Sequence, residues 1–256
     1  MNNLTSQAIL KLEQVSFNAK LNVKTKENLP GYSILKDISF EVPTGARVAI
    51  VGPTGAGKTF LLRLLNRLSE PTSGKIIYEN QDYTKIPVIQ LRSSVVLVPQ
   101  ESRLLGMTVK DALSYPLVLQ RLPKAEITQR VSQCVEQLQI PDDWLGRTEV
   151  QLSVGQRQLV ALARALVMKP KVLLLDEPTS NLDIGTTQKL LQTLSQLAQT
   201  QNTTVLMVNH QLDMASSCDN VIHLSQGRLI SNQHARDIDW EMLKANITTT
   251  EALDDF

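Results

Sequence analysis

A glycine-rich segment that directly follows an apolar run has the spacing of a phosphate-binding loop: Gly52, Pro53, Thr54, Gly55, Ala56, Gly57, Lys58 and Thr59. Glycines let successive backbone N–H groups turn inward and cradle an anion at the start of a helix. Lys58 adds a positive charge for the β and γ phosphates, and the Thr59 hydroxyl can ligate Mg²⁺. Because a chance match has a probability of about 1% at ordinary glycine frequency, we expect a nucleoside triphosphate site here.

Two carboxylates, Asp176 and Glu177, follow a second apolar run at residues 172–175. Successive residues of a strand point in different directions, so the two side chains can divide the work. We expect Asp176 to hold the Mg²⁺ shell and Glu177 to accept a hydrogen bond from the water that attacks the γ phosphate. Two acids at a strand end are more often a solvated turn, and the phosphate loop upstream is what favours the catalytic interpretation.

A third segment narrows the class of nucleotide-binding protein: Leu152, Ser153, Val154, Gly155, Gln156, Arg157 and Gln158, followed by a predicted helix at residues 159–168. This segment resembles the LSGGQ signature of ABC ATPases. Residues 9–230 as a whole resemble the ATPase domain of that family in the order and spacing of their motifs. The resemblance implies ATP as the nucleotide, since nothing in the phosphate loop itself selects adenine.

Three further roles follow from the resemblance alone. It implies that Gln100, after the strand 95–98, senses Mg²⁺ and the attacking water while touching a membrane subunit. It implies that residues 180–183 form the D-loop, which ends at Asp183, and that His210 contacts the γ phosphate. Taken singly, Gln100 is equally a plain loop residue and His210 a histidine satisfied by backbone groups.

The resemblance also implies that two copies share each ATP. Ser153 and the Gly155 N–H lie at the start of a helix, a second anion-binding end, which in this family faces the nucleotide held by the opposite copy. The predicted catalytic residues are therefore Glu177, His210, Gln100 and Lys58; the predicted metal ligands are Thr59, Gln100 and Asp176; the predicted nucleotide contacts are residues 52–59, Phe60, Ser153, Gly155, Gln156 and Asp183.

Three positions depart from the family pattern. Val154 replaces the first glycine of the signature and narrows the conformations of that turn. Phe60 stands where many members carry Ser or Thr, which removes a hydroxyl near the α phosphate. Ala19 occupies the position of the aromatic residue that usually stacks on adenine; Tyr32 is one replacement, and a plain surface tyrosine is the other interpretation.

The elements that must position these residues indicate an α/β protein. We predict a RecA-like phosphate-loop NTPase core with a small antiparallel β subdomain and an inserted helical lobe, the fold of ABC ATPases. Strand-like runs alternate with a helix at 58–68 in the first part of the chain and with a helix at 186–200 in the last part. The predicted core covers residues 8–90 and 170–235, the lobe 91–169 and the tail 236–256, of which we expect the polar residues 247–256 to fray.

Composition bounds the other possibilities. The 256 residues are 42% apolar, enough for one substantial folded unit. The 26 basic and 25 acidic residues nearly cancel, so no overall field favours nucleic acid as a partner. Cys134 and Cys218 lack metal-binding spacing and are interpreted as buried or idle thiols. The sequence shows no apolar run of the roughly 18 residues that span a bilayer, which predicts a cytoplasmic protein.

The leading hypothesis is therefore an ATPase subunit, peripheral on the cytoplasmic face of a membrane. It would pair with a second copy or a similar ATPase subunit and drive a polytopic membrane subunit that docks near residues 101–111. A soluble ABC ATPase of the iron–sulfur-assembly or another non-transport type is the alternative. A regulatory module that binds ATP without turnover is disfavoured by the presence of both Glu177 and His210.

Overall fold

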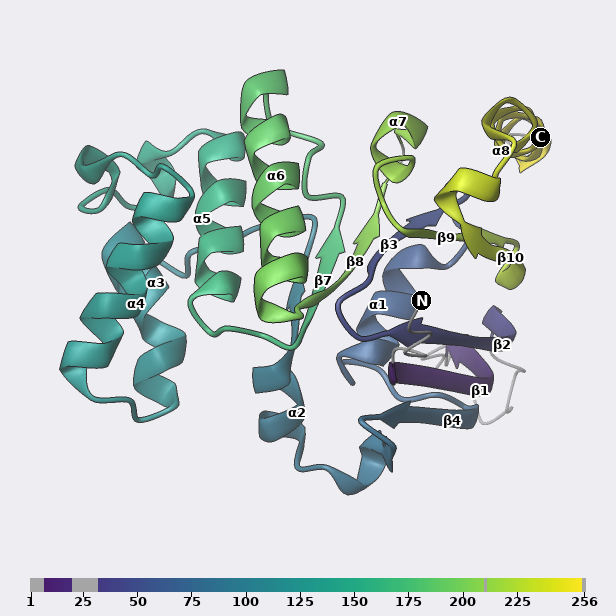
Figure 1. Ribbon diagram of the computed structural model, residues 1–256, viewed down its shortest axis with the longest axis horizontal. Coiled ribbons are helices and arrows are strands. Elements are labelled where there is room, and N and C mark those ends of the chain that lie inside the picture. The colour runs from purple at the N-terminus through teal and green to yellow at the C-terminus, as the bar shows by residue number, and fades with distance from the viewer. Residues whose placement is uncertain (1–6, 20–31, 210, 255–256) are drawn as a thin grey trace, which may run out of the picture.

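The computed structural model describes residues 7–19, 32–209 and 211–254, whose strands form two sheets (Figure 1). The first sheet has the order β2-β1-β4-β5 and the second the order β10-β9-β3-β8-β7-β6. The strands are β1 (Ala8–Ala19), β2 (Tyr32–Pro43), β3 (Arg47–Val51), β4 (Ser73–Tyr78), β5 (Gln81–Asp82), β6 (Val95–Val98), β7 (Val172–Asp176), β8 (Thr204–Val208), β9 (Asn220–Ser225) and β10 (Arg228–His234). The helices are α1 (Lys58–Leu65), α2 (Val88–Ser94), α3 (Val109–Leu119), α4 (Lys124–Gln137), α5 (Val154–Leu166), α6 (Ile184–Gln201), α7 (Leu212–Ala215) and α8 (Trp240–Asp254).

Strands β6, β7, β8, β3 and β9 run parallel, and β10 is antiparallel at the edge. Every residue of β7 and β8 is buried, as expected for continuous apolar strands covered on both faces of a parallel sheet. The carboxyl ends of parallel strands meet at one edge of the sheet. The segments that follow β3, β6, β7 and β8 are therefore brought together, although they lie up to 157 positions apart in the printed sequence (51 to 208).

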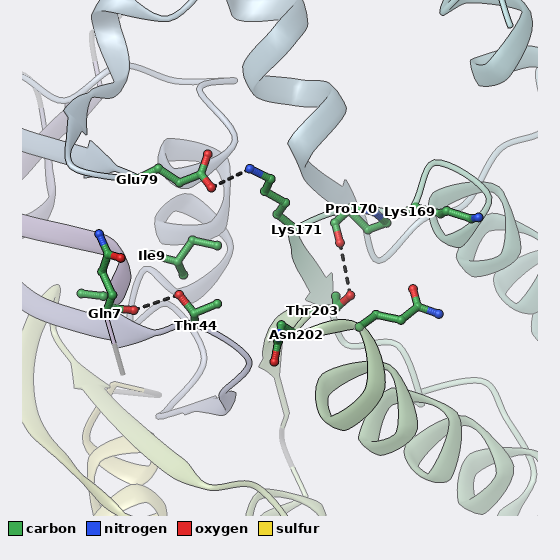
Figure 2. Close-up of a pocket in the computed structure, with 11 residues that line it drawn as sticks. Gln7, Ile9, Thr44, Glu79, Lys169, Pro170, Lys171, Asn202 and Thr203 are labelled. Carbon is green, nitrogen blue, oxygen red and sulfur yellow. Dashed lines mark hydrogen bonds and ion pairs between the residues drawn. The ribbon is translucent and has the colours of Figure 1, made fainter. Parts of the chain in front are cut away.

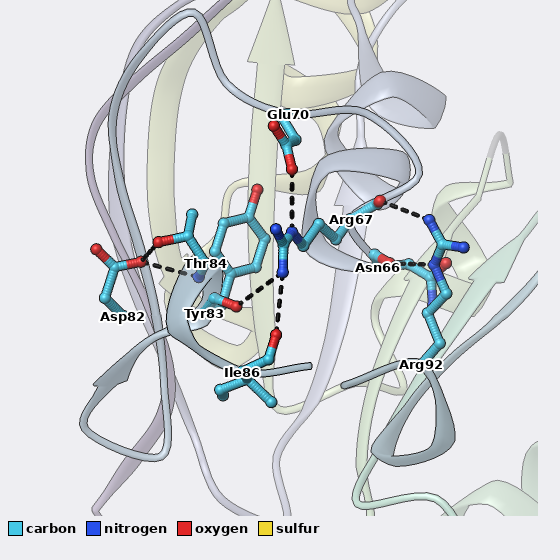
Figure 3. A network of polar contacts seen from close by, with 8 residues as sticks. All are labelled: Asn66, Arg67, Glu70, Asp82, Tyr83, Thr84, Ile86 and Arg92. Carbon is cyan, nitrogen blue, oxygen red and sulfur yellow. Dashed lines mark hydrogen bonds and ion pairs between the residues drawn. The ribbon is translucent and has the colours of Figure 1, made fainter. Parts of the chain in front are cut away.

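The antiparallel sheet packs over α1 with a core from alternating strand residues such as Leu10, Leu12 and Val15. A polar network at the end of α1 fastens this sheet to α2 (Figure 3). There the Arg67 guanidinium donates to the backbone oxygens of Tyr83 and Ile86, at 3.4 and 3.0 Å. Helix α1 ends at Leu65, three residues earlier than the predicted helix 58–68, where Arg67 has a φ of 58° and the Leu68 N–H donates to the Arg63 oxygen at 2.8 Å.

Helices α3, α4 and α5 form a lobe at one end of the molecule (Figure 1), and α3, α4 and α5 share a core with the parallel sheet. On α4, apolar side chains three and four positions apart face this core: Val131 is buried, Ile127 and Val135 are partly buried against it, and Leu138, just after the helix, is buried. Within the range 91–169 that was predicted to form the lobe, β6 belongs instead to the six-stranded sheet. The helices of the lobe begin at α3.

The prediction that residues 247–256 fray is wrong over most of that range, because α8 continues to Asp254. Leu243 is buried in the core shared by the lobe and sheet, and Trp240 and Ile247 pack partly buried against it. Spacings of three and four residues place these three side chains on one face of a helix. Most of the other residues of this helix are polar, which is why the composition alone predicts a frayed tail.

Both cysteines are free and buried, as predicted. Burial raises the pKa of the Cys134 thiol to about 12 and that of the Cys218 thiol to about 11. Within the described ranges, no helix combines the length and the apolar character that crossing a bilayer requires.

Candidate active site

The loop between β3 and α1 holds a backbone shape that only glycine tolerates at two positions. Gly52 and Gly57 have φ angles of 146° and 96°. A Cβ atom on Gly52 would lie 2.0 Å from the Leu224 oxygen, and one on Gly57 would lie 2.7 Å from Leu35 Cδ2. The loop is thus pressed against β2 and β9 with its N–H groups at the amino end of α1, the geometry that binds phosphate.

Lys58 is 6% exposed and folds back over the loop. Its Nζ atom donates to the Gly52 and Pro53 backbone oxygens at 2.6 and 2.8 Å. Burial lowers the pKa of the Lys58 ammonium, and nearby carboxylates, Glu177 foremost, counter that shift. A cation held on carbonyl oxygens next to an anion cradle is placed to exchange them for phosphate oxygens.

Thr59 and Asp176 meet beneath the loop, where the Thr59 hydroxyl donates to Asp176 Oδ1 at 3.3 Å. A hydroxyl and a carboxylate are hard oxygen ligands of the kind that Mg²⁺ prefers. Among the residues that the structure describes, no three acidic, histidine or cysteine side chains cluster into a metal cage. Two protein oxygens suit Mg²⁺ nevertheless, since this ion takes most of its ligands from phosphate and water.

Gln100 and Glu177 follow the adjacent strands β6 and β7, and their side chains touch: Gln100 Nε2 donates to Glu177 Oε2 at 2.8 Å. Both line a cavity of about 360 Å³ together with residues 54–60, Tyr32 and Ile34. The loop, the lysine and the two segments after β6 and β7 therefore converge on one cavity. His210 lies outside the described residues.

The outer end of this cavity is aromatic. Phe60 stacks on Phe17 with ring centroids 5.6 Å apart, which gives the residue that replaces Ser or Thr a packing role. Tyr32 is 75% exposed, and in the register of β1 and β2 it lies directly opposite Ala19. The Tyr32 ring on β2 therefore lies next to position 19 on β1, where the family usually carries an aromatic residue.

The other predicted nucleotide contacts lie apart from this cavity. Ser153 and Gln156 form a capping box at the start of α5: Gln156 N donates to Ser153 Oγ at 3.2 Å, and Ser153 N donates to Gln156 Oε1 at 2.9 Å. Val154 is 53% exposed. A Cβ atom on Gly155 would lie 2.5 Å from the Asn181 oxygen, so this glycine is needed for packing within the chain. None of the four lines the loop cavity.

Asp183 caps α6 and is not in the loop cavity either. Its Oδ1 accepts from Thr186 N at 2.9 Å and its Oδ2 from Thr186 Oγ1 at 2.6 Å. The side-chain hydrogen bond from Thr186, reinforced by the backbone one, lowers the pKa of the Asp183 carboxyl. The carboxylate is thus ionised and directed by its own helix.

Two contacts in these regions are not predicted from the sequence. Glu251 on α8 accepts a hydrogen bond from Thr54 N in the phosphate loop at 3.3 Å. No local motif announces this contact, because it joins residues 197 positions apart. Gln158 is a buried amide on α5 that contacts the segment after β7. The position of Gln158 beside the signature is evident from the sequence, but the direction of its amide is not.

A cavity of about 410 Å³ lies elsewhere, at the amino ends of β7 and β8 (Figure 2). Lys171 and Glu79 form an ion pair across it at 2.6 Å, and Thr203 Oγ1 donates to the Pro170 oxygen at 3.3 Å. Ligands of parallel sheets bind at the carboxyl ends of the strands. This cavity is at the other end and takes no part in the phosphate site.

Comparisons with known proteins agree with this geometry. A family model described as "ABC transporter" matches residues 35–180. A methionine import ATP-binding protein MetN 3 from Pectobacterium atrosepticum is 38% identical over 218 residues, which is 83% of this chain and 63% of that protein. MetN from Histophilus somni is 37% identical over 224 residues, 85% of this chain and 65% of that one. The chain thus spans less than two thirds of the length of these relatives.

Two solved structures have the same fold. A dimeric post-hydrolysis state of the ATP-binding cassette MJ0796 bound to ADP and Pi has a TM-score of 0.79 and 27% identity, over 90% of this chain and 100% of that one. The cbiO1 protein from Clostridium perfringens, part of the ABC transporter complex cbiONQ, has a TM-score of 0.77 and 29% identity, over 97% and 99% of the two chains.

Proposed function

The chain belongs to the ABC transporter family, and we propose that it binds ATP with Mg²⁺, hydrolyses it as a dimer and drives transport through a separate membrane subunit. The observation that carries this proposal is the convergence of the glycine loop, Lys58, Gln100 and Glu177 on one cavity. Among phosphate-loop proteins, the capped α5 with its signature segment is what distinguishes this architecture.

The residues of the cavity suit hydrolysis of a triphosphate. The loop N–H groups and Lys58 bind and orient the phosphates, which places the γ phosphate toward the carboxyl ends of β6 and β7. Thr59 and Asp176 would hold Mg²⁺, which would supply positive charge to the phosphate oxygens. Glu177 accepts a proton from the attacking water, and Gln100 holds the carboxylate in direction through its amide hydrogen bond. The inferred role of His210 at the γ phosphate belongs to the same scheme.

A second copy completes the site. Ser153, Gly155 and Gln156 lie outside the cavity of their own chain, yet the start of α5 presents a helix N-terminus that favours negative charge. We propose that this end closes over the γ phosphate held by a neighbouring copy, with Asp183 at the same junction. The dimeric state of the similar cassette MJ0796 supports this arrangement.

The membrane partner is proposed to dock beside Gln100, on residues 101–111. Leu105 is 69% exposed with a positive φ of 57°, while its neighbour Leu104 is fully buried and anchors the segment. Arg164 on α5 donates to the Arg103 oxygen at 3.0 Å, which ties the segment to the signature helix. Replacing Leu105 with a charged residue is expected to uncouple transport while basal ATP hydrolysis continues.

Such a partner would hold the protein on the cytoplasmic face of a membrane, where ATP is available. The MetN relatives are methionine import proteins by name, which favours a transport subunit over a soluble assembly ATPase. Methionine is accordingly the first substrate to test, although the residues that select a substrate would lie on the membrane subunit. Copurification of a polytopic membrane protein, with substrate-stimulated ATPase activity, tests this step.

The decisive experiment on the ATPase is Glu177→Gln. The amide keeps an oxygen for the Gln100 donor but cannot accept the proton, so the variant should bind Mg²⁺–ATP, persist as a closed dimer and release no phosphate. The measurements are phosphate release, equilibrium nucleotide binding and size by light scattering.

The matched control is Glu79→Gln, which removes a carboxylate from the ion pair at the far end of β7 and should leave turnover unchanged. Full phosphate release by Glu177→Gln would refute the assigned base. A strictly monomeric Mg²⁺–ATP complex of that variant over a broad concentration range would refute the shared site.

A further inference from the structure

Gln158 is a polar side chain with only 3% exposure, on the first turns of α5 just after the signature. Its amide makes two directed contacts with the segment after β7. Nε2 donates to the backbone oxygen of Glu177 at 2.8 Å, and Oε1 accepts from Asn181 Nδ2 at 3.4 Å. A buried amide is costly unless both ends are paired, so this side chain is committed to that one segment.

Gln158 contacts Glu177, whose backbone conformation requires stabilising contacts. Glu177 has a φ of 51°, in the left-handed region, a conformation that is unfavourable for a non-glycine residue and persists only where surrounding contacts determine it. The Glu177 N–H donates to the Val208 oxygen at 3.2 Å. Its carbonyl oxygen accepts from Gln158 at 2.8 Å and from Ser180 Oγ at 3.1 Å. Of these two side-chain donors, Gln158 makes the shorter bond, and it comes from another element of the fold.

Backbone direction at Glu177 fixes where its carboxylate points. The same carboxylate meets Gln100 Nε2 at 2.8 Å over the loop cavity. Since a displacement of about 1 Å in a catalytic group can reduce a rate by about 100-fold, a hydrogen bond that fixes this backbone affects chemistry more than binding. Gln158 itself does not line the cavity of the phosphate loop.

The contact also joins Glu177 to the signature. Ser153 caps the same helix five positions before Gln158, and Gly155 lies so close to the Asn181 oxygen that a Cβ there would approach to 2.5 Å. The first turn of α5 and the segment 177–181 are therefore packed as one unit.

We propose that Gln158 is a positioning residue for hydrolysis: its amide holds the Glu177 backbone in the left-handed conformation that aims the carboxylate at the attacking water. This inference rests on the proposed ATPase function. It predicts a fall in kcat without a matching loss of nucleotide affinity, because the phosphate loop and Lys58 are untouched.

The test compares Gln158→Leu with a matched control, Asn66→Leu. Asn66 is also a buried amide that donates to a backbone oxygen, that of Val95, but it stands away from Glu177. Gln158→Leu removes two buried hydrogen bonds and Asn66→Leu removes one, so both should lower the melting temperature, Gln158→Leu by the larger amount. Only Gln158→Leu should reduce kcat, by about 100-fold, with the Kd for Mg²⁺–ATP changed by less than about threefold.

A second variant covers the case in which Gln158→Leu does not fold. Gln158→Glu keeps the shape and the acceptor for Asn181, but its carboxylate cannot donate to the Glu177 oxygen, so kcat should fall in the same way. The positioning role is refuted if either folded variant matches the kcat of Asn66→Leu within about threefold, or if affinity falls in step with kcat. A parent protein that binds Mg²⁺–ATP without releasing phosphate would overturn the proposed ATPase, and this role with it.

Discussion

The phosphate loop and the signature segment are both starts of helices, yet the structure treats them differently. The loop before α1 is enclosed: Lys58 is buried and the side chains of Gln100 and Glu177 reach the same cavity. The signature before α5 caps its own helix and leaves Val154 largely exposed. The cavity at the loop end is lined by Gln100 and Glu177, whereas Ser153, Gly155 and Gln156 at the signature end do not line that cavity.

The phosphate loop and the signature segment therefore differ in how much of the proposed site a single chain supplies around them. The loop half can be assembled by folding alone, because parallel strands deliver its parts to one edge of the sheet. The signature half is rigid but open, as expected for a surface that meets a ligand held elsewhere. Substitutions that separate the two halves are therefore the most informative.

The largest effects should come from one substitution in the phosphate loop and one in the signature segment. Lys58→Ala removes a cation from the phosphate cradle and should weaken Mg²⁺–ATP binding by at least about 100-fold. Ser153→Asp keeps a good helix cap but adds a negative charge toward the neighbour's γ phosphate. It should retain binding to the monomer and lose nearly all turnover. Binding is measured by calorimetry and turnover by phosphate release.

Mixing the two inactive variants sharpens this comparison. In a mixed dimer, both lesions fall in one shared site and the other site is intact. An equimolar mixture should then regain about a quarter of the parent activity, if dimers form at random and sites act independently. Activity no greater than the sum of the separate variants would show that the halves do not meet across copies.

A middle-sized effect is expected at the outer end of the loop cavity. Tyr32→Ala removes the exposed ring opposite Ala19, and loss of base stacking of about 1.4 kcal/mol would weaken ATP binding about tenfold. Tyr32→Phe keeps the ring and should bind like the parent. Equal affinity of Tyr32→Ala and the parent would make Tyr32 a surface residue without a role in nucleotide binding.

The smallest effect is expected where α8 touches the loop. The Glu251 carboxylate accepts a hydrogen bond from the Thr54 N–H. It therefore places a negative charge beside the phosphate loop and pairs with one N–H group of that loop. Glu251→Gln should tighten ATP binding by about two- to fivefold at low salt, with the gain shrinking as salt screens the charge. Glu241→Gln, at the other end of α8, is the control. Weaker binding by Glu251→Gln would mean that the contact supports the loop rather than competing for it.

The comparison of the two halves also explains what the sequence could predict. The loop and β7 are local patterns, a glycine spacing and a continuous apolar run, and the predicted run 172–175 agrees with β7 to within one residue. Helix α5 begins at Val154, earlier than the predicted 159. The serine and glutamine of its capping box were in the sequence and could have indicated this start.

The parts that sequence reasoning missed depend on long-range contacts. The Glu251 contact and the direction of the Gln158 amide require the tertiary fold, since each joins elements distant in the chain. The same applies to α8. The roles of Trp240, Leu243 and Ile247 in packing become evident only when the core that they cover is known. The proposed catalytic residues follow from motifs, while the contacts that position them do not.

The two buried thiols make the protein well suited to site-specific labelling. With the pKa values of Cys134 and Cys218 raised to about 12 and about 11, hardly any thiolate exists near neutral pH, and maleimide reagents react through the thiolate. A cysteine introduced at an exposed position such as Met242 would therefore accept a fluorophore selectively in the native background. Opening and closing of the dimer could then be followed by energy transfer without first removing the native cysteines.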